Sequence, residues 1–422
     1  MSRDGGVHLT CDSGGISLRN QLSAAASLAS AAPRIGLHRS TGPSRAWEIR
    51  TVKPVTYTVR LVDDLFGLNS TDLVKAGQTQ RVSRIRRFVV LDAEVDWYHG
   101  DRIRKYFDHH NVETRFCVIR VNEQLKTVDT LLDVCRQLDE FGINRRVEPI
   151  IAIGGGVLCD VVGLLASLYR RGTPYVRVPT TLVGLVDAGV GAKTGVNFGE
   201  HKNRLDTYFP SSHTLLDRSF LATLDSRHIS NGLAEILKIG LIKDLRLFEL
   251  LEQHGSELIE TRLQAGNALD AVAVEVLDRA IQGMLEELQP NLWEHKLERL
   301  VDYGHSFSPL IEMRALPELL HGEAVTVDMA LTTCLARRRG LVSRRDQDRI
   351  FATMRALRLP LWHPVCDPAT LIAALRDTVR HRDGLQRIPL PLGIGQAYFA
   401  NDVTDDEIAQ ACDDVREEVC RA

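Results

Sequence analysis

The sequence predicts an α/β N-terminal domain built on a Rossmann-like parallel sheet, followed by an all-α C-terminal domain. Three observations support this prediction. Strand-like and helix-like segments alternate from Arg87 onward, an apolar strand runs into three glycines at residues 154–156, and segments with helical periodicity fill the chain after Asp217. Strands that alternate with helices are typical of a parallel sheet, whereas helical periodicity without intervening strands is typical of a helical domain.

Composition and charge exclude several classes of protein. Of the 422 residues, 44% are hydrophobic and 25% are charged, which is typical of a globular chain long enough for two domains. The formal net charge of −3 gives no electrostatic reason to expect nucleic acid as a partner. The eight cysteines show no paired spacing, no apolar run approaches the ~20 residues of a transmembrane helix, and the first residues lack a signal-peptide core. We therefore expect free thiols in a cytoplasmic protein.

The chain is expected to begin with a poorly ordered extension. Residues 1–45 are rich in Ser, Ala, Gly and Arg. Ordered structure is expected from about Trp47, because residues 47–52 and 55–62 alternate between apolar and polar like the two strands of a hairpin. The predicted division is an extension over 1–45, an α/β domain over 46–222 and a helical domain over 223–422.

The α/β pattern consists of short apolar strands separated by amphipathic helices. Strands are expected at residues 88–92, 114–121, 149–153 and 175–178, and helices at 95–109, 128–141 and 157–169. The glycine turn at 154–156 ends one strand and opens the next helix, which is where Rossmann-like folds bind the pyrophosphate of a dinucleotide. The turn lacks the usual G-x-G-x-x-G spacing, so other residues must support this interpretation.

Polar residues near strand ends provide that support. Asp92 ends one strand, and Asp160 lies one helical turn after the glycines. Thr180 and Thr181 follow the strand at 175–178. Carboxylates at strand ends can accept hydrogen bonds from ribose hydroxyls, although each acid could equally be a helix N-cap or a surface charge.

A glycine-rich stretch at 178–204 is expected to hold an anion. Its glycines would let backbone N–H groups approach a ligand closely, because glycine has no Cβ. Charge and donors come from Asp187, Lys193, Lys202, Asn203 and Arg204. A flexible surface loop is the alternative, but residues 178–186 are apolar. We therefore expect a turn-rich, hinge-side loop that binds an anion.

The helical half contains a candidate metal site. Glu235 and Lys238 are three residues apart in an expected helix at 229–243, so both project from one face. Together with Glu235, the distant His305 and His321 could form a three-ligand zinc site with an open position for substrate oxygens. Spacing alone cannot link such distant residues, and each histidine could instead be packed or exposed. Further helices are expected at 245–254, 271–288, 307–313, 323–338 and 344–357.

Six motifs in this order resemble those of the sugar phosphate cyclase superfamily, whose best-known member is dehydroquinate synthase. They are GGGVLCD, RRGTPYVRVPTTLVGLVDAGVGAKTGVN, HKN, GLAEILK, DYGHSFSP and LLHGEA, and the resemblance covers roughly residues 85–420. It implies a dehydroquinate synthase-like fold with an NAD-binding N-terminal domain and a metal- and substrate-binding C-terminal domain. It also implies an enzyme that uses NAD and Zn²⁺ or Co²⁺ to cyclise a seven-carbon sugar phosphate with elimination of phosphate.

The resemblance also implies roles for individual residues. The metal ligands would be Glu235, His305 and His321. NAD would contact Asp92, Glu123, Lys126, Gly155, Gly156, Asp160, Thr180 and Thr181. The substrate and its phosphate would contact Asp187, Lys193, Lys202, Asn203 and Lys238. Arg171 matches an arginine that reaches the phosphate in the neighbouring subunit, which implies a homodimer.

Departures from dehydroquinate synthase concern the residues around the substrate carboxylate. Glu298 and Pro309 stand where that enzyme has an arginine and a histidine. Asp302, a further candidate catalytic residue, replaces its asparagine, and residues 280–295 contain no lysine. A carboxylate in place of a guanidinium would repel a substrate carboxylate, so the substrate is expected to lack one.

Among cyclases with carboxylate-free substrates, the resemblance is greatest to the 2-epi-5-epi-valiolone synthases. The segments that carry it are QPNLWEHKL, GHSFSPLIEMRA and DTVRHRDGLQRIPLPLGIG. It implies sedoheptulose 7-phosphate as substrate and a reaction of oxidation, phosphate elimination, reduction, ring opening and aldol closure, in aminocyclitol biosynthesis. Cyclases forming 2-epi-valiolone or desmethyl-4-deoxygadusol, dehydroquinate synthase, an iron-type alcohol dehydrogenase and a non-catalytic nucleotide- or sugar-phosphate-binding protein are the alternatives.

Overall fold

The computed structural model describes residues 35–39, 45–78, 84–199, 201–264, 266 and 268–421. Residues 1–56 and 57–422 form two separate units. In the first unit, β1 (Gly36–Arg39) pairs antiparallel with β2 (Trp47–Arg50), and the guanidinium of Arg39 lies 5.5 Å from the ring centroid of Trp47. Strand β1 lies within the predicted extension, whose first 34 residues lie outside the described residues.

The predicted hairpin between residues 47–52 and 55–62 is wrong. Strand β2 pairs with β1, whereas β3 (Thr58–Leu61) lies parallel to β10 (His213–Leu216) at the edge of the main sheet. Alternation of apolar and polar residues identified both strands correctly. It does not specify the partner of a strand, because the same alternation suits an antiparallel neighbour and a parallel edge position.

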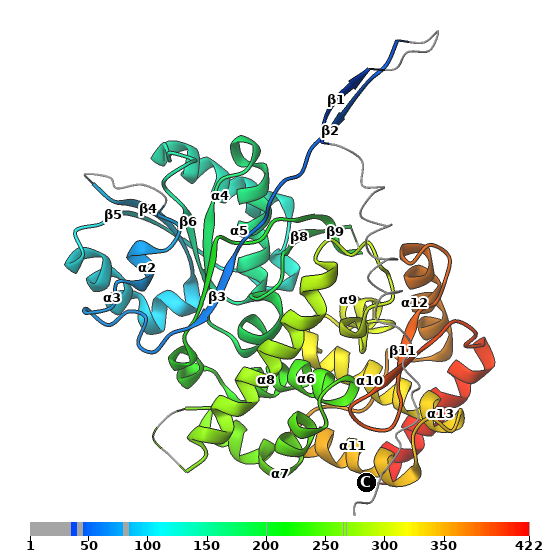
Figure 1. Cartoon of the computed structure of the whole chain (residues 1–422). Helices are drawn as coiled ribbons and strands as arrows, with labels where there is room; N and C mark the ends of the chain where they lie inside the picture. Colours follow the sequence, from blue (N-terminus) through cyan, green and yellow to red (C-terminus); the bar gives the residue numbers. More distant parts are fainter. Residues whose placement is uncertain are drawn as a thin grey trace, which may run out of the picture. The chain divides into compact units, whose positions relative to one another are not determined.

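Six parallel strands form the sheet of the second unit, in the order β3-β10-β7-β6-β4-β5 (Figure 1). The other four strands are β4 (Arg86–Asp92), β5 (Glu113–Ile119), β6 (Ile150–Gly154) and β7 (Tyr175–Pro179). The predicted Rossmann-like sheet is therefore confirmed. Because β5 and β6 flank β4 on opposite sides, the strand order reverses there, and a ligand crevice is expected at the carboxyl ends of β4 and β6.

Helices cover both faces of this sheet, close to their predicted positions. α3 (Ala93–His109) contributes Ile103 and Phe107 to the apolar core on one face, which also contains Val89 of β4. α4 (Val128–Phe141) and α5 (Gly156–Leu168) contribute to the core on the other face, with Phe88 of β4. Since both faces are buried, the strands are continuous apolar runs. Shorter helices are α2 (Asp72–Lys75), η1 (Glu123–Leu125) and η2 (Tyr169–Arg171).

The stretch at 178–204, which was expected to be a turn-rich loop, also contains regular elements. It contains a π-helical turn, η3 (Gly184–Ala188), followed by an antiparallel pair, β8 (Lys193–Phe198) and β9 (His201–Tyr208). Arg177, which is fully buried, donates hydrogen bonds to the carbonyl oxygens of Ala188, Gly191 and Lys193 at 3.1, 2.7 and 2.8 Å. These bonds fix the backbone between the π-helical turn and β8.

The second half of the chain is helical, as expected. Its helices are α6 (Ser226–Ile242), α7 (Leu245–Thr261), α8 (Asp270–Leu288), α9 (Ser308–Ala315), α10 (His321–Arg338), α11 (Arg344–Ala356), α12 (Pro368–His381) and α13 (Asp405–Cys420), with short turns η4 (Arg218–Thr223), η5 (Gln289–Asn291) and η6 (Leu300–Asp302). Helices α12 and α13, and an antiparallel pair of β11 (Ile388–Pro391) and β12 (Ala397–Ala400), were not predicted. The predicted boundary at 222/223 falls within η4, and the division itself stays a prediction.

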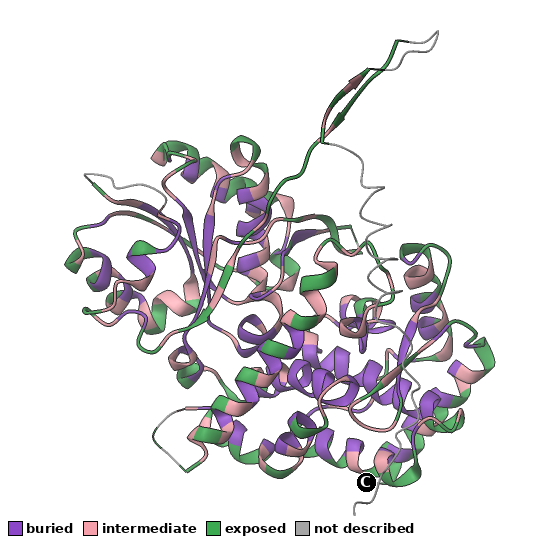
Figure 2. Ribbon diagram, in the orientation of Figure 1, coloured by how far each residue is buried: buried purple, intermediate pink, exposed green. Residues whose placement is uncertain are grey.

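Helices α6 and α10 are buried at the centre of this half (Figure 2). They approach each other closely at Gly322, where a Cβ would lie 2.0 Å from the carbonyl oxygen of Asn231. Only glycine permits this distance, which brings His321 close to Glu235 on the facing helix. None of the described helices is both long enough and apolar enough to cross a membrane.

Candidate active site

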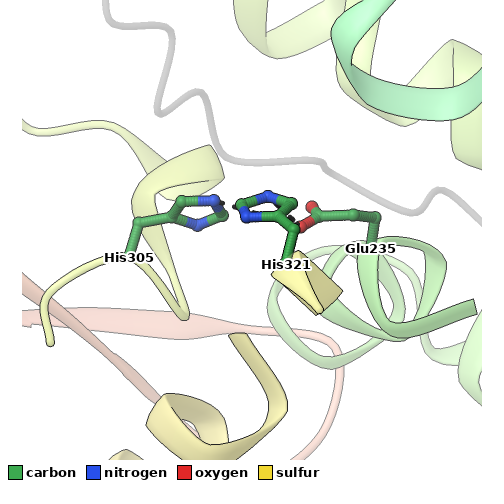
Figure 3. Close-up of side chains that lie close together, drawn as sticks. All are labelled: Glu235, His305 and His321. Carbon is green, nitrogen blue, oxygen red and sulfur yellow. Dashed lines mark ion pairs between the residues drawn. The ribbon is translucent and has the colours of Figure 1, made fainter. Parts of the chain in front are cut away.

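Three side chains from separate segments of the helical half converge on one point. Glu235 lies on α6, His305 precedes α9, and His321 is the first residue of α10. Oε1 of Glu235 is 3.3 Å from Nε2 of His321 and 3.9 Å from Nε2 of His305 (Figure 3). One ligand atom from each residue lies within 4.8 Å of the others. The residues that sequence spacing could not link are therefore arranged like the ligands of a metal ion.

The donor atoms of this cluster fit a divalent metal ion. Nδ1 of His305 is 3.1 Å from the carbonyl oxygen of Tyr303, and Nδ1 of His321 is 2.9 Å from Oε2 of Glu312. If each Nδ1–H donates to these acceptors, both Nε2 lone pairs face Glu235. Oε1 of Glu235 is buried and has no hydrogen-bond partner among the described residues. One carboxylate oxygen and two imidazole nitrogens are common ligands of Zn²⁺ and Co²⁺.

Burial and neighbouring charges set the protonation of the cluster. Burial acts to raise the pKa of Glu235, but Lys238 and the histidines outweigh it and hold this pKa well below its usual range. Burial, together with Lys238, lowers the pKa of His305 to about 3. Burial acts against the charge on His321, yet Glu312 and Glu235 raise its pKa to about 9. At neutral pH Glu235 is therefore charged and His305 neutral, which are the forms that bind a metal ion. His321 is protonated and would release a proton on binding the ion.

A cavity of about 1110 Å³ extends from this cluster to the carboxyl edge of the sheet. At its sheet end, Gly155 caps α5, and a Cβ on Gly156 would lie 3.1 Å from the Cβ of Ala188. The glycine at 156 thus lets Ala188 pack closely against the start of α5, and both glycines line the cavity at a helix N-terminus, which is the kind of position that binds a pyrophosphate. Asp92 accepts a hydrogen bond from N of Glu94 at 2.8 Å and so caps α3, while it also lines the cavity. Asp92 is therefore a helix N-cap, which was one of its two interpretations, and it also lies at the site.

Three more of the residues assigned to NAD, namely Glu123, Lys126 and Asp160, belong to a polar network on the cavity wall. Nζ of Lys126 is 2.6 Å from Oδ2 of Asp160 and 2.6 Å from Oδ1 of Asn203. Oε1 of Glu123 accepts a hydrogen bond from Nδ2 of Asn197 at 2.9 Å. Lys126 is almost fully buried, so its ammonium depends on these partners. The network places the predicted cofactor residues next to Asn203, which was assigned to the substrate.

Acidic and basic side chains also meet beside the metal cluster. Nζ of Lys193 is 2.5 Å from Oε1 of Glu294, and Arg299 forms ion pairs with both Glu294 and Asp302. Nη2 of Arg382 lies 3.4 Å from Oδ2 of Asp302. Burial acts to raise the pKa of Asp302, but Arg299 and Arg382 outweigh it and hold this pKa below its usual value. The carboxylate is therefore ionised where it lines the cavity.

The prediction that Glu298 lies where it would repel a substrate carboxylate is wrong. Glu298 is exposed and does not line the cavity, whereas Glu294, Asp302 and Pro309 do. Arg299, the next residue, places a guanidinium nearby, but the carboxylates of Glu294 and Asp302 neutralise it. The segment between α8 and α9 lacks helical periodicity, so the sequence could not show which of its side chains face inward.

The cavity is lined by every residue predicted to bind metal, NAD or substrate, except two. Glu235 is buried behind the histidines. Arg171, in η2, is exposed away from the cavity. Arg204, expected to help bind the anion, instead lies with Nη1 2.9 Å from Nε2 of His381.

Sequence reasoning missed residues that support the site. Glu312 is 2% exposed and contacts both Lys202 and His321. Ser308 lines the cavity with a buried hydroxyl that has no partner among the described residues. A single acid between apolar residues of an expected helix was the available signal for Glu312. No local pattern marks Ser308, because serine at a helix start is usually a cap.

Comparisons with known proteins agree with this arrangement. Residues 116–231 match the family model of the 3-dehydroquinate synthase N-terminal domain, and residues 232–379 match that of the C-terminal domain. A 2-epi-5-epi-valiolone synthase from Streptomyces albus is 62% identical over 87% of this chain and 90% of its own length. A demethyl-4-deoxygadusol synthase from Trichormus variabilis is 36% identical over 88% of this chain and 90% of its own length.

A solved structure shows the same fold with ligands. ValA, a 2-epi-5-epi-valiolone synthase from Streptomyces hygroscopicus subsp. jinggangensis, is 54% identical in sequence and superposes with a TM-score of 0.84. The match covers 88% of this chain and 100% of the ValA chain, whose structure contains NAD⁺ and Zn²⁺. The structure of this relative therefore confirms the predicted fold, an α/β domain followed by a helical domain.

Proposed function

Because this chain belongs to the 3-dehydroquinate synthase family of sugar phosphate cyclases, we propose that it converts sedoheptulose 7-phosphate into 2-epi-5-epi-valiolone and phosphate. The observation that carries the proposal is a single cavity that joins a Glu–His–His cluster, a glycine turn at the strand-order reversal and several lysines. A dinucleotide, a metal ion and a sugar phosphate can meet in such a space. The reaction class is a carbon–oxygen lyase that eliminates phosphate.

The bound groups would supply chemistry that side chains lack. NAD would take up and later return a hydride, and a Zn²⁺ or Co²⁺ ion would act as a Lewis acid. Glu235, His305 and His321 would hold the ion through one oxygen and two nitrogens. The start of α5 at Gly155, together with Asp92 and the Lys126 network, would hold NAD at the carboxyl edge of the sheet.

The remaining polar residues would bind the substrate and stabilise its leaving group. Lys193 and Lys238 would neutralise the phosphate as its C–O bond breaks, and the amide of Asn203 would donate a hydrogen bond to it, because preorganised cations and donors stabilise developing negative charge. Lys202, which precedes Asn203 on β9, would contribute a further positive charge. The departing phosphate can itself accept the proton from the neighbouring carbon. Burial raises the pKa of Asp187, and this carboxyl group would hold substrate hydroxyls between NAD and the metal.

The charges near Lys193 favour a substrate without a carboxylate. Glu294 and Asp302 face the cavity as anions, and Arg299 and Arg382 are already paired with them. A substrate carboxylate would therefore find no free guanidinium there, which argues against dehydroquinate synthase activity. The choice of product among cyclases of sedoheptulose 7-phosphate rests on the greater identity to the 2-epi-5-epi-valiolone synthases.

One incubation tests the proposal. The protein, sedoheptulose 7-phosphate, NAD⁺ and Zn²⁺ or Co²⁺ are combined, the cyclitol is identified by NMR, and phosphate and NADH are measured. We expect 2-epi-5-epi-valiolone, one phosphate per cyclitol and no net NADH; the chelated protein and the His305→Ala variant are the controls. Turnover of only the carboxylated precursor of 3-dehydroquinate, stoichiometric NADH from an alcohol, or ligand binding without phosphate release would each overturn it.

We also propose a homodimer in which Arg171 serves the neighbouring site. Arg171 is exposed on the second unit and absent from its own cavity, which supports a role outside it. Co-expressing Arg171→Ala with His305→Ala would give mixed dimers with one complete site, so activity should return. Dimers that remain inactive would contradict the proposal. A cytoplasmic location also stays a proposal, supported by the free thiols of all described cysteines.

A further inference from the structure

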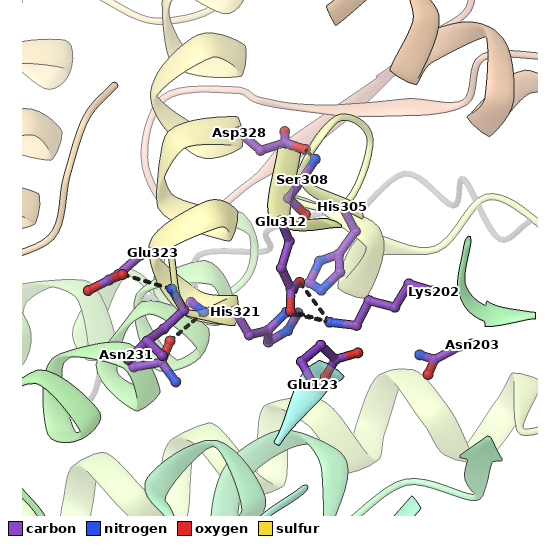
Figure 4. Close-up of polar contacts among 12 residues, drawn as sticks. Glu123, Lys202, Asn203, Asn231, His305, Ser308, Glu312, His321, Glu323 and Asp328 are labelled. Atoms are coloured by element: carbon purple, nitrogen blue, oxygen red, sulfur yellow. Dashed lines mark hydrogen bonds and ion pairs between the residues drawn. The ribbon is translucent and has the colours of Figure 1, made fainter. Parts of the chain in front are cut away.

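Glu312 connects three elements around the metal cluster. Its carboxylate, on α9, is 2.8 and 2.7 Å from Nζ of Lys202 on β9, and its Oε2 is 2.9 Å from Nδ1 of His321 on α10 (Figure 4). Nζ of Lys202 is also 3.1 Å from the same Nδ1. Glu312 is 2% exposed, so these two partners replace water around a buried charge.

The geometry determines which group can donate to which. A lysine ammonium only donates, and a carboxylate only accepts, so Glu312 accepts from Lys202 through both oxygens. Nδ1 of His321 then carries a hydrogen and donates to Oε2 of Glu312. When His321 gives up its second proton to a metal ion, this tautomer leaves Nε2 free as a ligand, 3.3 Å from Oε1 of Glu235.

We propose that Glu312 is a positioning residue that fixes the tautomer and orientation of the metal ligand His321 and, through the same carboxylate, places Lys202 at the cavity. Carboxylates that accept from a ligating histidine orient the ring and increase its basicity. Lys202 reaches the site from the β8–β9 pair, so Glu312 also ties that pair to the helical half. The part of the proposal that concerns substrate rests on the proposed function, whereas the effect on metal binding does not.

Metal affinity and metal geometry test the proposal directly. Glu312→Gln keeps the size of the side chain but removes its charge, so Zn²⁺ affinity, measured by competition with a chromophoric chelator, should fall about 10- to 100-fold. The visible absorption of the Co²⁺-loaded protein should change, since the ring of His321 is no longer held. The KM for the sugar phosphate should rise as Lys202 loses its partner.

Two further variants separate positioning from general packing. Glu418→Gln removes another carboxylate, 9% exposed on α13 and 2.8 Å from Arg344, and should leave Zn²⁺ affinity within about threefold of wild type. Lys202→Met should raise the KM while Zn²⁺ affinity stays within about threefold, because Glu312 still accepts from His321. Thermal unfolding of each metal-free variant measures folding separately.

The outcomes that overturn the inference are specific. Wild-type Zn²⁺ affinity together with an unchanged Co²⁺ spectrum in Glu312→Gln would overturn it. If that variant does not fold, Glu312→Asp decides, because it keeps the charge but shortens the side chain; it should weaken Zn²⁺ binding, and wild-type binding would again overturn the inference. A protein that shows these metal effects but does not cyclise sedoheptulose 7-phosphate would contradict the proposed function alone.

Discussion

Nζ of Lys238 lies 2.6 Å from Oε2 of Glu235, and both side chains are almost fully buried. The two residues are one helical turn apart on α6. Burial acts to lower the pKa of Lys238, but Glu235 and Asp187 outweigh it and raise the pKa. Lys238 therefore provides the counter-charge for Glu235 whenever no metal ion does so.

Replacing Lys238 with Met should destabilise the metal-free protein by about 3–5 kcal/mol, because the buried carboxylate of Glu235 would lose its nearest counter-charge. Added Zn²⁺ should then increase the melting temperature more in the variant than in the wild type, since the ion binds only the folded form. Urea unfolding and calorimetry with and without Zn²⁺ measure both effects. Lys243→Met, which removes a half-buried pair with Glu287, should cost at most about 1 kcal/mol. Equal effects of the two substitutions would contradict this account.

Arg177→Met should destabilise the protein by about 3 kcal/mol and also weaken substrate binding, because three carbonyl groups lose their charged donor and Lys193 is no longer held. Arg87→Met is the matched control: Arg87 is 1% exposed and donates at 2.9 Å to the carbonyls of Arg86 and Val74, away from the cavity. It should lower the free energy of unfolding similarly but leave the KM unchanged. If both variants change the KM equally, the effect of Arg177 is general loss of stability.

Asp328 should make stability depend on pH. Burial raises its pKa to about 6, although N–H groups of Phe307 and Ser308 donate to its carboxylate. The unfolded carboxyl titrates near 3.8, so the folded protein binds the extra proton between these values. The contribution of Asp328 to the free energy of unfolding is fully present below pH ~4. It falls by about 3 kcal/mol as pH rises through ~6. Asp328→Asn should remove this decline.

Urea unfolding of Asp328→Asn and wild type between about pH 3 and 7.5 measures the difference, a range that spans the unfolded carboxyl pKa. The variant should gain stability relative to wild type as pH rises. Asp367→Asn should behave in the opposite sense, because the bond from the backbone N–H of Thr370 lowers the pKa of Asp367, so wild type loses stability as pH falls. Parallel profiles for Asp328→Asn and wild type would show that Asp328 does not titrate in this range.

Glu294→Gln should strengthen binding of anions. The Glu294 carboxylate is 2.5 Å from Nζ of Lys193 and would compete with a phosphate for that ammonium. Removing its charge should lower the inhibition constant of inorganic phosphate and the KM for the sugar phosphate by about 2- to 5-fold. Glu286→Gln, whose carboxylate pairs with Lys243 at 3.2 Å, should change neither constant. Weaker phosphate binding would mean that Glu294 holds substrate rather than competing with it.

The sequence by itself determined the elements and much of the chemistry. Apolar runs and helical periodicity located β4 to β7 and α3 to α11 within a few residues, except that α7 ends at Thr261 rather than at residue 254. Both signals depend on which side chains of one short segment are buried. The pairing of Glu235 with Lys238 was also predictable, since an i,i+3 spacing in a helix fixes its own geometry. The glycine turn was predicted at the carboxyl edge of the sheet, where Gly155 and Gly156 line the cavity.

Only the tertiary structure decided which distant segments meet. It joined His305 and His321 to Glu235, paired β2 with β1, and turned Glu294 rather than Glu298 toward the cavity. It also revealed Arg177 and Glu312, which act through partners on other elements. The physical reason is that periodicity records which face of a segment is buried, whereas a contact between segments depends on how those faces pack against each other.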